Sequence, residues 1–301
     1  MTQAQCNSHT PHPKAYNKAF LIAITVNAVF VGLQATFALL ANSTSLLADA
    51  THNLGDVLSL ILAWIANSLM QRLPTTRSTY GLKKTSILAA FINGTLLIFT
   101  CGIIVTQAIY KFVSPGPVDA LMVIIVAAIG ILVNGATAFL FVQGTNDLNI
   151  RGAFLHLVYD ALVSLGVVLS AILLYFTGWL WLDPIVGLSI AAIILRGTWA
   201  LFADSFRMMI DAVPSSVSID DVKALLSSLP GVKGMHDLHV WALSTRENAL
   251  SVHLWMPEES LEDEARFRLA ETLRHNHNIH HITIQVENNQ AYCQDTCIPS
   301  I

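Results

Sequence analysis

Six long apolar stretches restrict the folds that this chain can adopt. A helix that crosses a lipid bilayer needs about 20 mostly apolar residues. The stretches that meet this length cover residues 17–41, 45–70, 84–112, 118–143, 151–176 and 179–206. Six buried helices of a soluble protein would need far more surface charge, because only 12% of the residues are charged and the mean hydropathy is +0.58. The sequence therefore predicts an α-helical membrane protein with six transmembrane helices.

The charge is spread unevenly along the chain. Residues 1–210 carry a net charge of +3, whereas residues 211–301 carry −7 and seven of the 11 histidines. This contrast predicts lipid around the first part and water around the second. The expected domains are an N-terminal tail (1–16), a membrane domain (17–210), a water-exposed domain (211–289) and a cysteine-containing tail (290–301). The overall net charge of −4 offers no basic face, so we expect no nucleic-acid partner.

The orientation in the membrane follows from lysine and arginine in the short connections, which favour the cytoplasmic side. Such residues occupy the N-terminal tail, the connection after the second stretch and the one after the fourth: Lys14, Lys18, Arg72, Arg77, Lys83, Lys84 and Arg151. The opposite side has only Lys111, near the end of the third stretch. Both chain termini are therefore expected in the cytoplasm.

Two transmembrane stretches carry matching pairs of ionisable residues. His52 and Asp56 are four positions apart and share one helix face, as do His156 and Asp160. At about 1.5 Å per residue, Asp56 lies about 16 Å from the outer end of its helix, and Asp160 about 14 Å from the inner end of its own. Both pairs reach the centre of the bilayer, where ionisable side chains are usually functional.

Two imidazoles and two carboxylates form a tetrahedral ligand set that suits Zn²⁺. The carboxylates neutralise the ion, and a histidine nitrogen cannot hold a metal and a proton together, so such a site can exchange metal for protons. The alternative is that each pair is a hydrogen bond of helix packing. Asp49 either supports the metal ligands from behind, relays protons or packs between helices. Three asparagines are expected to join helices by hydrogen bonds: Asn53, Asn93 and Asn134.

Several specific strings resemble the cation diffusion facilitator family, the bacterial-like zinc-type heavy-metal/proton antiporters. In the membrane part these are Ser45–Asp56, Tyr80–Lys84, Ala89–Gly94, the pair His156/Asp160 and Gly178–Pro184. In the water-exposed part they are His236–Trp241 and Thr283–Glu287. The resemblance covers nearly the whole chain.

The resemblance implies a homodimer in the cell (inner) membrane that exports Zn²⁺ from the cytoplasm by alternating access. The positions that match the family's central ligands are His52, Asp56, His156 and Asp160. A histidine at the first of these positions is the variant associated with a preference for zinc over cadmium. Many relatives carry a histidine-rich loop between the fourth and fifth helices, but residues 143–151 contain no histidine here.

In the water-exposed part, the spacing of apolar residues predicts the order helix, strand, strand, helix, strand. The expected elements cover residues 219–229, 236–243, 249–255, 261–275 and 282–287. This order matches the small α+β ferredoxin-like cytoplasmic domain of the family. The resemblance makes His236, His253 and Glu287 positions of a regulatory zinc site, which is expected to be weaker because Gln285 stands where some members have histidine.

Other histidines and the cysteines are more ambiguous. His239 lies three residues after His236, which places the two on opposite faces of a regular strand, so we expect His239 to be a packing or surface residue. A later cluster is either metal-binding or an ordinary loop: His275, His277, His280 and His281. Cys293 and Cys297, with Cys6 near the start, could form a zinc-capture site joined from both tails, whereas Cys101 is expected to pack among apolar residues.

Two other functions compete with zinc export. A membrane metalloenzyme would use the same His/Asp site, but it needs a general-base motif such as His-Glu-x-x-His, which does not occur. A metal sensor that transports nothing would not need carboxylates in the middle of the membrane. The residues leave the choice among Zn²⁺, Cd²⁺, Co²⁺ and Ni²⁺ open, because selectivity depends on geometry.

Overall fold

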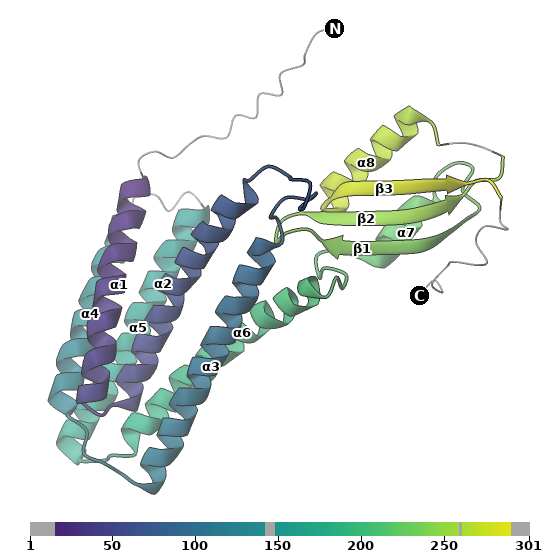
Figure 1. The fold of residues 1–301 in the computed structure, drawn as a ribbon. Coiled ribbons are helices and arrows are strands. Elements are labelled where there is room, and N and C mark those ends of the chain that lie inside the picture. Colours follow the sequence, from purple (N-terminus) through teal and green to yellow (C-terminus); the bar gives the residue numbers. More distant parts are fainter. Residues whose placement is uncertain (1–15, 142–147, 259–260, 290–301) are drawn as a thin grey trace. The chain divides into compact units, whose positions relative to one another are not determined.

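A computed structural model describes residues 16–141, 148–258 and 261–289, which form eight helices and three strands (Figure 1). The membrane-type helices are α1 (Tyr16–Leu40), α2 (Thr44–Met70), α3 (Thr85–Val113), α4 (Ala120–Phe141), α5 (Leu148–Thr177) and α6 (Leu182–Met209). In the described part of the chain, α2 to α6 contain windows long and apolar enough to cross a membrane, and α1 contributes the shorter apolar segment Thr25–Leu40. All six predicted helices are therefore present.

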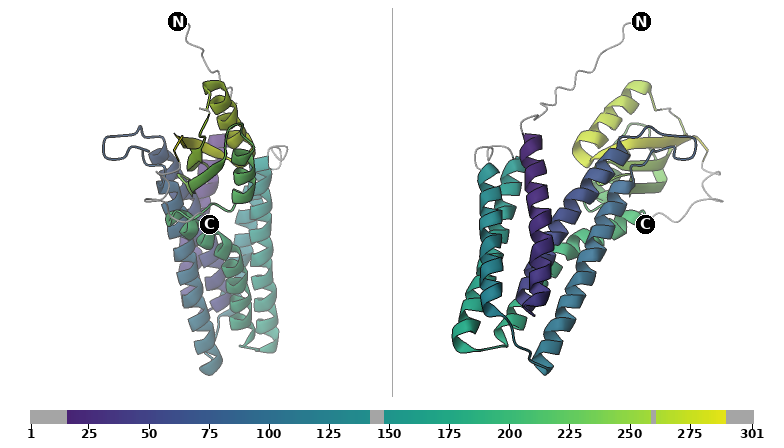
Figure 2. Two further views of the ribbon diagram at one scale, coloured as in Figure 1. Left: turned by 90° about the vertical axis from the view of Figure 1, so that its right-hand side faces the viewer. Right: turned by 60° about the vertical axis from the view of Figure 1, so that its left-hand side comes forward.

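Contacts along the chain group the residues into two compact units. The first contains Met1–Leu58 and Phe99–Leu195, and the second contains Ser59–Ile98 and Arg196–Ile301. Three helices, α2, α3 and α6, contribute residues to both units. Within the first unit α4 and α5 run side by side (Figure 2).

A buried carboxylate at the beginning of α6 holds the beginning of α2. Asp183 accepts hydrogen bonds from the hydroxyls of Ser43 (2.5 Å) and Ser45 (2.7 Å) and from the backbone N–H groups of Thr44 (2.6 Å) and Ser45 (3.2 Å). The first N–H groups of a helix have no partner within that helix, so Asp183 satisfies donors that would otherwise be unpaired. Lys111, near the end of α3, completes the cluster, with its Nζ 3.2 Å from Asp183 Oδ2.

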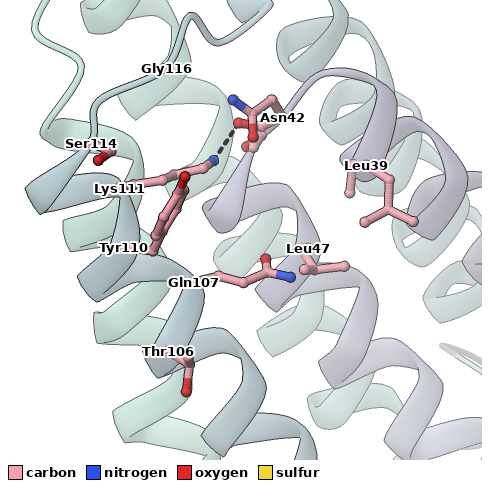
Figure 3. Close-up of a pocket in the computed structure, with 11 residues that line it drawn as sticks. Leu39, Asn42, Leu47, Thr106, Gln107, Tyr110, Lys111, Ser114 and Gly116 are labelled. Atoms are coloured by element: carbon pink, nitrogen blue, oxygen red, sulfur yellow. Dashed lines mark hydrogen bonds between the residues drawn. The ribbon is translucent and has the colours of Figure 1, made fainter.

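A cavity of about 560 Å³ adjoins this cluster and is lined by the ends of α1 and α3 and the start of α2. Figure 3 shows Lys111 donating a hydrogen bond to the backbone oxygen of Asn42 across it. Gly187 of α6 allows the close approach to the beginning of α2, because a Cβ at this position would come within 2.8 Å of the Thr44 side chain.

The predicted asparagine contacts are partly present. Asn53 donates to Gln34 Oε1 at 3.1 Å within the first unit, and Asn93 donates to Ser59 Oγ at 2.7 Å within the second. The expectation for Asn134 is wrong within the part of the chain that the structure describes, because neither polar atom of its buried side chain has a hydrogen-bond partner there. Cys101 is buried in α3, as expected.

The second unit contains a small α+β domain built from α7 (Ile219–Ser227), β1 (Gly234–Ala242), β2 (Asn248–Trp255), α8 (Asp263–His277) and β3 (Ile279–Glu287). The strand order is β1-β2-β3, with β1 antiparallel and β3 parallel to β2. Both helices pack on one face of the sheet, and the buried core comprises Val222, Leu226, Val240, Leu250, Val252, Leu254, Leu269 and Leu273, among others. The predicted element order is confirmed, although β3 begins three residues earlier than expected.

Candidate metal centres

Three of the four predicted transmembrane ligands meet between α2 and α5. His52 and Asp56 lie one turn apart on α2, and Asp160 lies on α5. The Nε2 atom of His52 lies 3.1 Å from Asp160 Oδ1 and 4.0 Å from Asp56 Oδ2. One ligand atom from each residue falls within 4.8 Å of the others. The prediction that residues of the two helices face each other is therefore met for these three.

The fourth predicted residue, His156, belongs to α5 and precedes Asp160 by one turn. Its side chain lies outside the described part of the structure, so its place in the group stays a prediction. A ligand at this position would come from the same helix face as Asp160 because residues four apart on a helix lie one above the other.

The side chains of this group are largely buried but keep some contact with solvent. The Asp160 side chain is only 4% exposed, while His52 and Asp56 are 16% and 30% exposed. The edge of the Tyr159 ring packs against the His52 ring, with the centroids 6.4 Å apart. A nitrogen and two carboxylates in such a place can bind a borderline divalent cation, and the two carboxylates balance its charge.

Asp49 lies outside this group, three residues before His52 on α2. It is fully buried, and its Oδ2 accepts hydrogen bonds from Gln34 Nε2 (2.6 Å) on α1 and Ser164 Oγ (2.9 Å) on α5. These partners were not among the candidate residues chosen from the sequence. One signal for Ser164 was available, because it follows Asp160 by four positions and so shares its helix face.

A second group forms on the sheet of the small domain, one residue from each strand. His236 Nε2 lies 2.9 Å from Glu287 Oε2, and His253 Nδ1 lies 2.9 Å from Glu287 Oε1. The two imidazole rings are 5.0 Å apart at an angle of 74°. Gln285 donates a hydrogen bond of 2.8 Å to Glu287 and thus adjoins the group. The three predicted residues are brought together.

A β-bulge changes the expected position of His239. His236 is paired with His253 and His239 with Ser251, so two residues of β1, Asp237 and Leu238, lie opposite the single residue Val252 of β2. The inserted residue is Asp237, whose φ is +53°. As a result His239 faces the same side of the sheet as His236, and the expectation of opposite faces is wrong. Asp237 Oδ1 lies 2.8 Å from His239 Nε2, and Asp237 Oδ2 lies 3.7 Å from His253 Nε2.

The remaining candidates do not join either group in the described part of the chain. His275 and His277 end α8, whereas His280 and His281 belong to β3, so the cluster is not a loop. None of the four takes part in a group of three potential ligands among the described residues. Cys6, Cys293 and Cys297 lie outside those residues.

Comparisons with known proteins agree along most of the chain. Residues 20–210 match the family model of the cation efflux transmembrane domain, and residues 214–289 match that of the cation efflux protein cytoplasmic domain. The cadmium, cobalt and zinc/H(+)-K(+) antiporter of Bacillus subtilis (strain 168) is 34% identical over 295 residues, which is 96% of this chain and 94% of that protein. The zinc transporter ZitB of Escherichia coli (strain K12) is 31% identical over 297 residues, covering 98% and 94% of the two chains.

Relatives of the same kind extend to a further organism. The metal cation efflux system protein CzcD of Cupriavidus metallidurans is 31% identical over 282 residues, covering 92% of this chain and 88% of that protein. A solved structure of the metal-bound C-terminal domain of the CzcD transporter is 36% identical and covers 24% of this chain and 99% of that chain, with a TM-score of 0.22.

Proposed function

Since the chain belongs to the cation efflux family, we propose that it exports Zn²⁺ from the cytoplasm in exchange for protons. The matched family model and the relatives are cation efflux transporters rather than enzymes, which removes the metalloenzyme alternative. The observation that carries the proposal is the convergence of His52, Asp56 and Asp160 on one point between two membrane helices.

The proposed transport site comprises His52 and Asp56 of α2 with His156 and Asp160 of α5. The distances of 3.1 Å and 4.0 Å from His52 to the two carboxylates support it, because Zn²⁺ binds nitrogen and oxygen ligands at about 2.0–2.2 Å and its ligand atoms therefore lie close to one another. Zinc is the proposed cargo because this ligand set is a borderline nitrogen/oxygen set, and because ZitB is named a zinc transporter.

Proton exchange follows from the chemistry of the same ligands. A histidine must be neutral to bind metal, so protons that arrive from the outer side compete with the ion for the imidazole nitrogens. Two carboxylates keep the loaded site near electrical neutrality in a low-dielectric surrounding. We propose that the site opens alternately to the two sides of the membrane, with both chain termini in the cytoplasm as the loop charges predict.

The group on the small domain is proposed as a cytoplasmic zinc site that regulates transport. Two imidazole nitrogens and a carboxylate within 4.8 Å of one another fit such an ion. His236, His253 and Glu287 would hold it and join the ends of all three strands. We further propose that two copies of this domain pair in a homodimer.

Flux of Zn²⁺ into proteoliposomes under an imposed pH gradient tests the proposal. Wild type is compared with Asp160→Asn, which keeps the size of the side chain but removes its charge. Asp204→Asn on α6 is the matched control, because Asp204 is partly exposed and belongs to neither group. Loss of gradient-driven flux in Asp160→Asn alone supports the proposal. Equal flux in all three proteins contradicts the transport site, and a folded wild type that binds Zn²⁺ without flux favours a sensor.

A further inference from the structure

In the described part of the chain, two polar contacts between α2 and α5 lie one helical turn apart. Asp49 precedes His52 by three residues on α2, and Ser164 follows Asp160 by four residues on α5. Ser164 Oγ donates to Asp49 Oδ2 at 2.9 Å, and His52 Nε2 lies 3.1 Å from Asp160 Oδ1. The two helices are therefore connected beside the proposed transport site by a pair of residues that does not belong to it.

The contact between Asp49 and Ser164 is enclosed completely. Both residues are 0% exposed, so water does not compete for the hydrogen bond. In a low-dielectric interior a hydrogen bond is stronger than in water, and the loss of one partner leaves the other unpaired. The distance between α2 and α5 at this level is consequently held by the length of the bond.

A third helix fixes the orientation of the Asp49 carboxylate. Asn53 on α2 donates to Gln34 Oε1 at 3.1 Å, which directs the Gln34 amide N–H towards Asp49 Oδ2 at 2.6 Å. Both donors reach Oδ2, and in the described part of the chain Oδ1 has no hydrogen-bond partner. The carboxylate cannot rotate without breaking its bonds to both α1 and α5.

We propose that the cluster Gln34–Asp49–Ser164 sets the separation of α2 and α5 and thereby the size of the cation that the transport site accepts. The inference rests on the proposed function, because it takes His52, Asp56 and Asp160 as ligands. Asp49 and Ser164 act here as positioning residues and do not touch the ion.

The physical reason is that the metal–ligand distances preferred by a small and a larger cation differ by only a fraction of an ångström. Zn²⁺ needs its nitrogen and oxygen ligands at about 2.0–2.2 Å, while a larger cation such as Cd²⁺ needs longer distances. Removing the contact one turn away lets the helices separate by a fraction of an ångström at the ligands. Such a change weakens binding of the small ion more than that of the large one. Loss of a residue that orients ligands typically lowers metal affinity about 10–100-fold.

Ser164→Ala tests the inference, with Ser170→Ala as its matched control. Ser170 is also buried in α5, but its hydroxyl donates to the backbone oxygen of Val167 in the same helix at 2.8 Å. Zn²⁺ and Cd²⁺ affinities are measured by calorimetry on the full chain in detergent, and the visible spectrum of bound Co²⁺ reports ligand geometry. All proteins carry Glu287→Gln, which removes the shared carboxylate of the second group.

The expected result is a fall of about tenfold in the preference for Zn²⁺ over Cd²⁺ in Ser164→Ala, with an altered Co²⁺ spectrum, and no change in Ser170→Ala. Equal preference and identical spectra in the two variants would overturn the inference. A fall in both variants alike would also overturn it, because it would reflect a general loosening of α5.

Substitutions of Asp49 separate positioning from charge. Asp49→Asn keeps an oxygen that can accept from Ser164 and Gln34, so it is expected to keep the metal preference, whereas Asp49→Ala is expected to lose it. If Asp49→Asn behaves like Asp49→Ala, the charge matters rather than the hydrogen bonds, and the positioning role is wrong. Asp160→Ala is titrated with Zn²⁺ in parallel. If this variant binds Zn²⁺ as tightly as the wild type, the proposed transport site is wrong, rather than the positioning role of Asp49 and Ser164.

Discussion

Lys111 Nζ lies 3.2 Å from Asp183 Oδ2, and the two side chains are only 11% and 3% exposed. The pair joins the end of α3 to the beginning of α6, while Asp183 also binds the beginning of α2. The negative charge of Asp183 is balanced by the Lys111 ammonium group and by the hydroxyl and N–H groups that donate to it, and the carboxylate is almost completely buried. The cluster thus explains why the only basic residue expected at the outer side lies where it does.

Replacement of the lysine in this pair is expected to destabilise the protein. Breaking a buried ion pair by removing one partner costs about 3–5 kcal/mol, and we expect about 3 kcal/mol for Lys111→Met because Asp183 keeps its hydroxyl and N–H donors. Thermal unfolding in detergent measures the change. Lys84→Met is the control, because Lys84 pairs with Asp211 at 2.7 Å with about half of each side chain exposed, and such pairs contribute less than about 1 kcal/mol. Equal effects would show that the Asp183 pair adds nothing through burial.

The bulge at Asp237 gives a prediction about backbone conformation. A φ of +53° is strained for residues with a Cβ, less so for aspartate and asparagine, and unstrained for glycine. Asp237→Ala and Asp237→Gly both remove the carboxylate, so their difference isolates the backbone. We expect the alanine variant to be less stable than the glycine variant by about 1 kcal/mol, measured by unfolding of the full chain. Identical stabilities would mean that the bulge is not maintained.

A change at Gln285 should strengthen the proposed cytoplasmic site. Gln285 is paired with His253 across β2 and β3, and its amide lies 2.8 Å from Glu287 Oε1. Gln285→His adds a nitrogen ligand beside the group, so we expect Zn²⁺ affinity to rise about tenfold. Calorimetry in an Asp160→Ala background restricts the measurement to this site. Adding Glu287→Gln should cancel the gain, and an unchanged affinity in Gln285→His would contradict the proposed ligand geometry.

Selectivity should also depend on the histidine of α2. His52→Asp replaces a nitrogen ligand by a third carboxylate, which removes a ligand type that favours zinc and adds negative charge. We expect the ratio of Cd²⁺ to Zn²⁺ flux in proteoliposomes to rise. Tyr159→Phe is the control, because it preserves the ring that packs against His52 at 6.4 Å. A ratio that does not move in His52→Asp would remove His52 as a determinant of metal choice.

Much of the architecture was predictable because it depends on periodicity. The lengths of the apolar stretches predicted the six helices, and the alternation of apolar and polar residues predicted the strands of the small domain. The group of His52, Asp56 and Asp160 was also predictable, since a spacing of four residues puts side chains on one helix face and antiparallel helices bring matching depths together.

Other features could not be obtained from spacing. The bulge inserts a single residue, Asp237, and this reverses the face expected for His239. Periodicity assumes a regular strand and cannot reveal the insertion. In the sequence, Asp183 is recognisable only as a polar residue at the start of a helix. The folded chain shows its partners, which are Ser43, Thr44, Ser45 and Lys111. Gln34 was missed for the same reason, because its partner depends on how α1 is rotated against α2.

The hydrogen bond between Gln34 and Asp49 also bears on how the protein is made. These residues are 15 positions apart, whereas His52 and Asp160 are 108 positions apart. During synthesis α2 therefore enters the bilayer long before α5 can supply a partner for its polar face. Gln34 belongs to α1, the helix directly before α2 in the chain, so the α1–α2 hairpin brings its own partner for the buried carboxylate. The same side chain that orients Asp49 in the finished transporter can thus shield it during membrane insertion.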